Sequence, residues 1–280
     1  MSWTYVDGSF KRSSGARVLA GDQGLLFGRG VFETFLATLG KRVFLLDRHV
    51  ARMRAGALLL GITPPAYVEN LEESVQALLS RNRLQAGRVR ATLTAGPDGG
   101  SPSLVIQAQS STGYEEAMYR DGVGVIVAEV RRNESSPLSR AKSLNYLDNI
   151  LAREDARSQG AMEALLLNTK GVLAEGSASN VFLIAGGEVI TPRIADGALP
   201  GVTRQAVLEI AAARSLVTQE RRVTPEELMG ADEVFLTSAV AGVLPVRKIG
   251  GRVVGAGQPG EMTRELRCQL MQMRDTPPAQ

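Results

Sequence analysis

Lys142 is the residue whose type and setting point most directly to chemistry. The lysines of the chain are Lys11, Lys41, Lys142, Lys170 and Lys248. Lys142 stands between a strand predicted at 122–127 and an amphipathic helix predicted at 149–158. A cleft at that position would desolvate the amine and favour its neutral, nucleophilic form, which can form a Schiff base with an aldehyde. The alternative is a solvated surface lysine, as most lysines are.

Glu175 is the second candidate, because it ends a predicted strand and is followed by the small residues Gly176-Ser177-Ala178-Ser179-Asn180. Small residues let the backbone approach a flat ligand closely. A carboxylate at such a place can hold a ring nitrogen protonated, which supports the electron-sink action of pyridoxal phosphate. The alternative is an ordinary turn before a hairpin.

A predicted anion site lies at Leu199-Pro200-Gly201-Val202-Thr203-Arg204. This tight turn leads into a helix, whose first N–H groups and positive dipole end can bind a phosphate. Arg52 could add a fixed charge, since a guanidinium meets two phosphate oxygens at once. We interpret His49, three residues earlier on the same predicted helix, as supporting structure, because no serine or cysteine nucleophile motif accompanies it.

Composition excludes several function classes. The chain has 280 residues, 44% of them hydrophobic, which is enough for a substantial core in one large or two smaller domains. Cys268 and His49 are the sole cysteine and histidine, so no disulfide, Cys/His zinc site or multi-histidine metal centre is expected. The net charge is +3, but the arginines are interspersed with acids and form no stripe for nucleic acid. No apolar run matches a membrane helix or a secretion signal, so we expect a cytoplasmic protein that does not bind membranes.

Hydrophobic periodicity predicts alternating helices and strands. Residues 43–46 are predicted as a strand, and Asp47 as the N-cap of a helix that ends near Gly61. The polar run 109–113 indicates a link between two domains. The predicted organisation is an N-terminal α/β domain at 1–110, a linker at 111–121 and a cofactor-binding domain at 122–280.

Several motifs together resemble one enzyme family. In chain order they are 22–34 (DQGLLFGRGVFET), 49–52 (HVAR), 142–145 (KSLN), 175–177 (EGS), 199–204 (LPGVTR), 237–240 (TSAV) and 244–246 (LPV). The chain resembles the fold type IV pyridoxal-phosphate enzymes, the class IV aminotransferases that include branched-chain and D-amino-acid aminotransferases and the aminodeoxychorismate lyases. The resemblance implies an α/β fold of the α+β type, with a small N-terminal α/β domain and a larger C-terminal domain that has a β-barrel-like sheet core. It also implies a homodimer, with pyridoxal 5'-phosphate held between the two domains.

By this resemblance, Lys142 is the Schiff-base lysine and proton shuttle, and Glu175 is the partner of the pyridine nitrogen. The phosphate ligands it implies are Arg52, Val202, Thr203 and Ala239. Tyr146 resembles the tyrosine that some members place beside the phenolic oxygen of the cofactor. The cofactor-binding set implied as a whole is Arg52, Lys142, Tyr146, Glu175, Ser179, Asn180, Val202, Thr203, Ser238 and Ala239.

The substrate residues fit neither main subgroup. D-amino-acid enzymes carry a tyrosine where Phe32 stands and an arginine where Ala95 stands. Branched-chain enzymes have an arginine resembling Arg90, but a tyrosine where Arg88 stands. Since Arg88 and Arg90 alternate along one predicted strand, both should lie on the same face and could bind a carboxylate. The substrate-binding candidates are Phe32, Arg88, Arg90, Val240 and Arg29.

We therefore predict an aminotransferase that moves an amino group between a branched-chain L- or D-amino acid and a 2-oxo acid. One alternative is an aminodeoxychorismate lyase, which forms pyruvate and 4-aminobenzoate with the same lysine. The threonine that one such lyase uses corresponds to Leu25 here. Another alternative is a nucleic-acid-binding or regulatory module that kept the fold without catalysis.

Overall fold

The computed structural model describes residues 2–111 and 113–275 and divides the chain into two compact units. Unit 1 comprises Met1–Gly113 together with Ala141–Asn145, and unit 2 comprises Tyr114–Arg140 and Tyr146–Gln280. This division differs from the predicted one in two ways. Most of the predicted linker, from residue 114 onward, belongs to unit 2, and the short segment around Lys142 belongs to unit 1. Thr112, near the start of that linker, lies outside the described residues.

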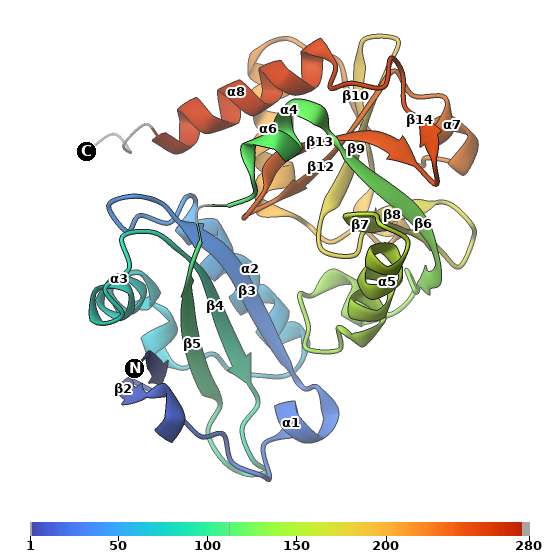
Figure 1. The fold of residues 1–280 in the computed structure, drawn as a ribbon. Helices are drawn as coiled ribbons and strands as arrows, with labels where there is room; N and C mark the ends of the chain where they lie inside the picture. Colours follow the sequence, from blue (N-terminus) through green and yellow to red (C-terminus); the bar gives the residue numbers. More distant parts are fainter. Residues whose placement is uncertain (1, 112, 276–280) are drawn as a thin grey trace. The chain divides into compact units, whose positions relative to one another are not determined.

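Unit 1 contains an antiparallel sheet with the strand order β2-β1-β5-β4-β3 (Figure 1). The strands are β1 (Trp3–Val6), β2 (Ser9–Arg12), β3 (Gly30–Ala37), β4 (Gly87–Thr94) and β5 (Ser103–Ser110). Burial alternates along β4, where Val89, Ala91 and Leu93 are fully buried. The intervening Arg88, Arg90 and Thr92 are more exposed, as expected for a sheet with one face packed on a core. Arg88 and Arg90 therefore share a face, as predicted.

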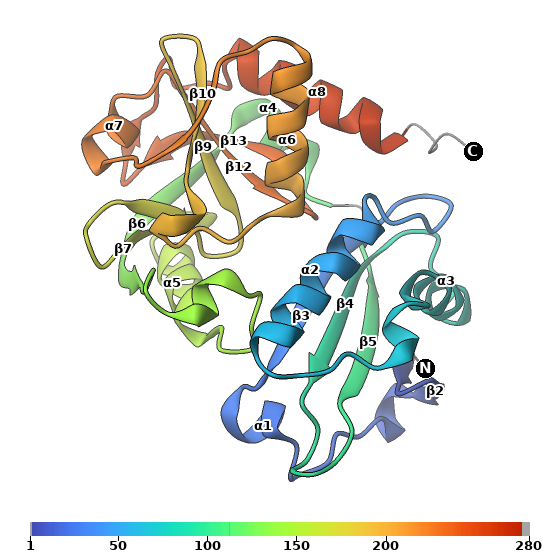
Figure 2. The same cartoon turned by 180° about the vertical axis from the view of Figure 1, so that it is seen from behind.

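Helices cover the buried face of this sheet (Figure 2). α2 (Leu46–Leu59) packs on β3, and α3 (Leu71–Arg81) packs on β1 and β5. The short elements are α1 (Gln23–Phe27), η1 (Ser13–Gly15) and η2 (Ala66–Val68). The prediction for 43–46 was wrong: Val43 forms a single bridge with Ala37, and the helix starts at Leu46. Leu45, in a left-handed conformation, is the N-cap of this helix. Asp47 lies in the first turn, where its carboxylate still interacts favourably with the helix dipole.

Unit 2 is built on a mixed nine-stranded sheet. Its order is β11-β10-β9-β12-β13-β6-β7-β8, with β14 paired to β13. The strands are β6 (Val123–Arg132), β7 (Glu163–Asn168), β8 (Leu173–Gly176), β9 (Asn180–Ala185), β10 (Glu188–Pro192), β11 (Thr218–Arg221), β12 (Glu233–Ser238), β13 (Gly242–Ile249) and β14 (Arg252–Val253). The terminal strand β8 also contacts β9 and β10, with which it does not pair, so the sheet curls back on itself. This curled sheet corresponds to the predicted barrel-like core.

The core of unit 2 lies inside the curl, where apolar residues from most strands meet. It includes Val125, Leu165, Leu173, Val181, Leu183, Ile190, Leu236, Leu244 and Ile249. α5 (Leu147–Ser158) packs on β6 and β7, α6 (Val202–Ala213) on β12, and α8 (Glu261–Asp275) on β12 and β13. α4 (Glu116–Asp121), from the predicted linker, packs on β13. The remaining elements are η3 (Pro137–Arg140), η4 (Ile194–Asp196) and α7 (Pro225–Met229). Among the described residues, no helix combines the length and the apolar character that crossing a membrane requires.

Candidate active site

The segment that carries Lys142 is held by the edge of the unit 1 sheet. β3 is the last strand of that sheet, so the backbone groups on its outer side are available for pairing. The N–H of Phe32 donates to the carbonyl of Lys142 at 2.8 Å, and the N–H of Leu144 donates to the carbonyl of Gly30 at 2.9 Å. A Cβ at Gly30 would lie 2.6 Å from the Leu93 carbonyl oxygen, so glycine permits this close approach. The backbone of Lys142 is thus fixed to the strand that carries Phe32.

Lys142 and Arg90 both lie over the ring of Phe32. The Lys142 Nζ is 4.6 Å from the ring centroid, and the Arg90 Cζ is 3.7 Å from it. Both distances are within the range of cation–π attraction. Arg88, by contrast, is exposed and donates to the Gln109 Oε1 at 3.1 Å. Of the two arginines, Arg90 is therefore the one next to the lysine.

Arg52 is bound by a buried carboxylate in unit 1. Its Nε donates to the Glu33 Oε1 at 2.8 Å and its Nη2 to the Glu33 Oε2 at 2.7 Å. The Nδ1 of His49 lies 2.8 Å from the same Oε2. Burial would raise the pKa of Glu33, but Arg52 and His49 outweigh it and lower that pKa to about 2. Because the ionised carboxylate only accepts hydrogen bonds, the Nδ1 of His49 is the donor.

The guanidinium of Arg29 makes three hydrogen bonds to described residues of unit 1. It donates to the carbonyl of Leu60 at 3.1 Å, the carbonyl of Gly61 at 3.1 Å and the Gln23 Oε1 at 2.7 Å. These contacts join the loop before β3 to the end of α2. Binding of a substrate carboxylate by Arg29 stays a prediction, and it would compete with these bonds.

Glu175 is buried in β8 of unit 2 and is held on both carboxylate oxygens. The backbone N–H of Leu199 donates to the Oε2 at 2.8 Å, and the Arg132 Nε lies 3.2 Å from the Oε1. The carboxylate and the guanidinium are 7% and 16% exposed, so water screens this ion pair little. Arg132 also donates to the carbonyls of Gly197 and Ser139, both at 3.3 Å.

A second polar cluster orders the loop after Glu175. The hydroxyl of Tyr146 donates to the carbonyl of Ser177 at 2.6 Å, and the Nδ2 of Asn149 donates to the same carbonyl at 2.9 Å. The buried Glu163 accepts hydrogen bonds from the Ser177 hydroxyl, the Ala178 N–H and the Ser179 hydroxyl. Burial, and then the charges of Glu175 and Glu163, raise the pKa of Tyr146. Tyr146 therefore stays a phenol, able to donate a hydrogen bond, at neutral pH.

Asn180 connects this loop to the start of α6. Its Nδ2 donates to the carbonyl of Leu199 at 2.8 Å. Its Oδ1 lies so near Gly201 that a Cβ at that position would collide with it. Because Leu199 also donates to Glu175, the carboxylate and the beginning of α6 are linked through one short segment.

The first turn of α6 has the properties of an anion site. Among the described residues, no side chain caps this helix at Gly201. The first N–H groups of any helix lack an intrahelical acceptor, so those of α6 can donate to a ligand. Val202 and Thr203, the predicted phosphate ligands, occupy this turn and are buried. A helix N-terminus of this kind can hold a phosphate.

The β12–β13 turn lies beside Asn180, which pairs with Thr237 across the sheet. Ser238 ends β12 and its hydroxyl accepts the N–H of Ala241 at 3.1 Å, while Ala239 and Val240 form the turn itself. The hydroxyl of Thr237 is buried and, within the described part of the chain, has no hydrogen-bond partner. A buried unsatisfied hydroxyl is costly, so this one fits a site that is completed by a polar ligand.

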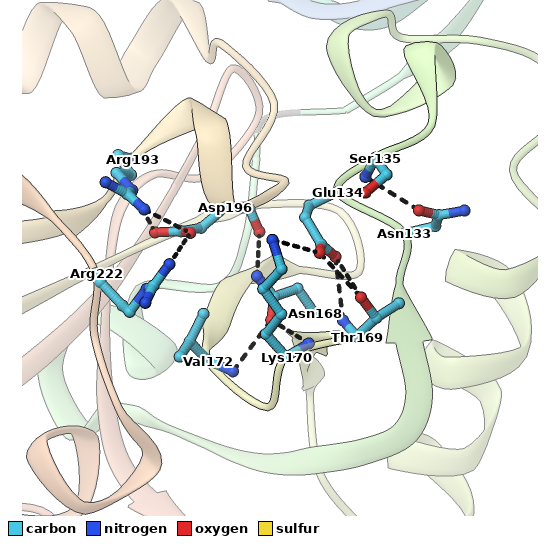
Figure 3. Close-up of polar contacts among 10 residues, drawn as sticks. All are labelled: Asn133, Glu134, Ser135, Asn168, Thr169, Lys170, Val172, Arg193, Asp196 and Arg222. Atoms are coloured by element: carbon cyan, nitrogen blue, oxygen red, sulfur yellow. Dashed lines mark hydrogen bonds and ion pairs between the residues drawn. The ribbon is translucent and has the colours of Figure 1, made fainter.

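The segment that leads to Leu199 is anchored by the polar network of Figure 3. The buried carboxylate of Asp196 pairs with Arg193 at 2.7 Å and with Arg222 at 3.6 Å. The backbone carbonyl of Asp196 accepts a hydrogen bond from the Nδ2 of Asn168 at 3.1 Å. In the same figure, Glu134 accepts hydrogen bonds from the N–H and the hydroxyl of Thr169. The Asp196 contacts fix the segment that leads to Leu199, whose N–H donates to Glu175.

Sequence reasoning did not identify several residues that support the site. They are Glu33 in unit 1 and Arg132, Asn149 and Glu163 in unit 2. Glu33 had a visible signal, since it is the lone acid in the mostly apolar stretch 30–37. The others had none that separates them from surface residues, because their partners are distant in sequence.

The fold and these motifs agree with known proteins. The family described as amino-transferase class IV matches residues 30–249. A branched-chain-amino-acid aminotransferase from Pseudomonas aeruginosa is 33% identical over 256 residues, covering 86% of this chain and 83% of that protein. A D-alanine aminotransferase from Bacillus licheniformis is 31% identical over 256 residues, covering 89% of each.

Solved structures give the same result. The branched-chain amino acid aminotransferase of T.th. with pyridoxamine 5'-phosphate has a TM-score of 0.91 at 28% identity, covering 99% of this chain and 95% of that one. A chain from Legionella pneumophila described as a 4-amino-4-deoxychorismate lyase has a TM-score of 0.85 at 26% identity, covering 93% of this chain and 97% of that one. With its motifs, fold and relatives in agreement, this chain belongs to the class IV aminotransferase family.

Proposed function

We propose that this enzyme uses pyridoxal 5'-phosphate to move an amino group between an amino acid and a 2-oxo acid. The observation that carries the proposal is the Leu199 segment of unit 2. Its backbone N–H holds the buried Glu175 carboxylate, and α6 begins three residues later with an uncapped first turn. The segment thus connects two groups. One is a carboxylate that could pair with a protonated ring nitrogen, and the other is a helix turn that could bind a phosphate.

Pyridoxal phosphate supplies an electron sink for the bond that breaks at the substrate's α-carbon. Glu175, held as an anion by Arg132 and Leu199, would keep the ring nitrogen protonated. Val202 and Thr203, with Ser238 and Ala239, would bind the phosphate through backbone and hydroxyl donors, and Arg52 would add charge. Ser179 and Asn180 would shape the ring site. Tyr146 would lie beside a ring oxygen, and its phenol would donate to that oxygen only by giving up its hydrogen bond to the Ser177 carbonyl.

Lys142 would attach the cofactor covalently and then move the proton at the α-carbon. Its backbone is fixed to β3, and its amine lies on the Phe32 ring beside Arg90. We propose that Arg90 binds the substrate carboxylate, because its guanidinium lies over the same Phe32 ring as this amine. Arg88, Arg29 and Val240 are secondary candidates.

We further propose a homodimer, and a cytoplasmic location stays a prediction. Leu147, Ile150 and Leu151 lie on one side of α5 and are 64%, 45% and 49% exposed. In unit 1, Leu25, Leu26 and Phe27 are 65%, 56% and 71% exposed. Contiguous apolar surface of this kind supports a protein interface. Ile150→Glu should shift the molar mass measured by light scattering from dimer to monomer, and an unchanged dimer would remove α5 from the interface.

A lyase of the same fold is the second candidate, since the Legionella chain described as a lyase is similar over nearly the whole length. Product analysis separates the two reactions. Formation of pyruvate and 4-aminobenzoate from aminodeoxychorismate without an added 2-oxo acid would support the lyase. Transfer from an L- or D-amino acid to 2-oxoglutarate or pyruvate would support the aminotransferase, and a panel of both enantiomers would give the handedness.

The decisive experiment is borohydride reduction of the cofactor-loaded enzyme, followed by peptide mass mapping. We expect the reduced cofactor on the peptide that contains Lys142. A tag on Lys11, Lys41, Lys170 or Lys248, or no tag at all, would refute the proposed function.

A further inference from the structure

A buried polar cluster lies between β3 and α2 in unit 1, where the surrounding contacts are apolar. It consists of Glu33, His49 and Arg52, and the first two are 0% and 1% exposed. Phe35 and Met53, one on each element, are each 1% exposed. Phe35 also packs against the His49 ring, with centroids 5.6 Å apart. A charged cluster therefore replaces what could have been a continuous apolar interface.

Such a cluster is a poor way to stabilise a fold. Removing an ion pair from water costs several kcal/mol, and well-packed apolar replacements are often as stable or more so. The ion pair instead fixes the orientation of the arginine side chain, because two parallel hydrogen bonds to one carboxylate fix the plane of a guanidinium. The Nε and Nη2 of Arg52 are bound in this bidentate manner.

The Glu33 carboxylate is itself fixed. Its Oε2 accepts from both Arg52 and His49, and its Oε1 accepts from Arg52. Its backbone is in the middle of β3, paired with Ala91 of β4. Arg52 is thus oriented by a group that a strand and a buried ring hold in place, whereas its own side chain retains 13% exposure.

We propose that Glu33 is a positioning residue for the cofactor phosphate, which it serves by holding the Arg52 guanidinium in its binding orientation, with His49 as a second support. This inference rests on the proposed function. Glu33 itself need not touch the cofactor. Removal of the Glu33 carboxylate should therefore weaken binding of the cofactor phosphate and leave binding of the cofactor ring unchanged.

The test compares two ligands that differ only in the phosphate. The affinities of Glu33→Gln for pyridoxal 5'-phosphate and for pyridoxal are measured by absorbance titration of the purified enzyme. We expect the affinity for pyridoxal phosphate to fall about tenfold or more, because a charged hydrogen-bonded support is lost. The affinity for pyridoxal should stay within about twofold, since the ring contacts are unaffected. Equal losses for both ligands, or no loss for either, would overturn the proposal.

A double-variant cycle supplies the matched control. If Glu33 acts through Arg52, then Glu33→Gln should cost nothing further in phosphate selectivity when Arg52→Gln is already present. Additive losses would contradict the proposal. Thr34→Ala, the neighbour on the opposite face of β3, should keep the wild-type preference for pyridoxal phosphate.

His49→Gln provides a milder variant if Glu33→Gln does not fold. It keeps the ion pair and removes one support, so we expect a selective loss of a few-fold for pyridoxal phosphate. No selective loss in this folded variant would overturn the role of the cluster. If the wild-type enzyme binds neither ligand, the proposed function itself fails, and this outcome is distinct from failure of the positioning role.

Discussion

In unit 1, the buried Glu33 carboxylate holds the Arg52 guanidinium through two hydrogen bonds between side chains. In unit 2, the buried Glu175 carboxylate is itself held, by the backbone N–H of Leu199 and by Arg132. The first arrangement depends on the identity of both side chains. The second depends partly on the backbone, which any residue except proline can supply at position 199. Substitutions in the supporting residues should therefore affect the two units unequally.

The largest expected effect tests whether unit 1 contributes the reactive group. Lys142→Ala should lower transamination by at least about a thousandfold, because the nucleophile and proton carrier are removed. Lys142 is only half-buried, so the free energy of unfolding in urea should change by less than about 1 kcal/mol. Lys170→Ala, a lysine of unit 2 that is 62% exposed, is the control and should keep its activity. Near-normal turnover by Lys142→Ala would take Lys142 out of the mechanism.

A second prediction concerns the charge of Glu33 in unit 1, which the pH dependence of the free energy of unfolding reports. The pKa of Glu33 is about 2, below its ordinary value of 4.5, so its contribution to stability is complete above pH 4.5 and is lost as the pH falls toward 2. Urea unfolding of wild type and Glu33→Gln at pH 6 and pH 3 should show it. The stability difference between them should shrink by about 2 kcal/mol at pH 3. A difference that does not depend on pH would mean that Glu33 is not ionised in the native state.

In unit 2, Glu175→Gln should bind the cofactor but abstract the α-proton about a hundredfold more slowly, because the ring nitrogen loses its anionic partner. A larger α-deuterium isotope effect on the turnover rate would report this step. Leu199→Ala keeps the backbone donor and is the matched control, with an expected rate near wild type. A normal rate in Glu175→Gln would show that the carboxylate does not serve the ring.

A smaller effect is expected at Tyr146, also in unit 2. Because burial and the Glu175 and Glu163 charges raise its pKa, the phenol stays protonated throughout pH 6–9. Tyr146→Phe should therefore lower the turnover rate by about tenfold, equally at every pH in that range, as one hydrogen bond is lost. A loss that varies across this pH range would mean that Tyr146 titrates there.

The parts of the site that sequence reasoning predicted are those whose meaning is local. The helix predicted to follow the turn at 199–204 is α6 (Val202–Ala213), since the Pro-Gly turn and the apolar period lie next to each other in the chain. The curled sheet of unit 2 and the family also agree with the prediction. The roles of the individual site residues stay predictions.

What escaped prediction depends on distant pairing. The 141–145 segment joins unit 1 because β3, more than a hundred residues earlier, offers it an open edge. A domain boundary predicted from composition assumes that each domain is one continuous stretch of the chain. It therefore misses a short segment that packs with the other unit. Likewise, the pairing of Glu33 with Arg52 needs β3 and α2 in contact, so the acid could be noticed but its partner could not be assigned.

The smallest difference is expected within one strand of unit 1, between Arg90 and Arg88. Arg90 lies against Phe32 beside the Lys142 amine, so Arg90→Gln should raise the KM for the amino acid about tenfold or more, as a guanidinium–carboxylate pair is lost. Arg88 is exposed and bonded to Gln109, so water screens its charge and Arg88→Gln should change KM less than about threefold. Steady-state kinetics on both variants with one amino acid decides between them. A larger effect at Arg88 would mean that the substrate carboxylate binds further along β4, away from the lysine, and that proximity to Phe32 is the wrong guide to the carboxylate site.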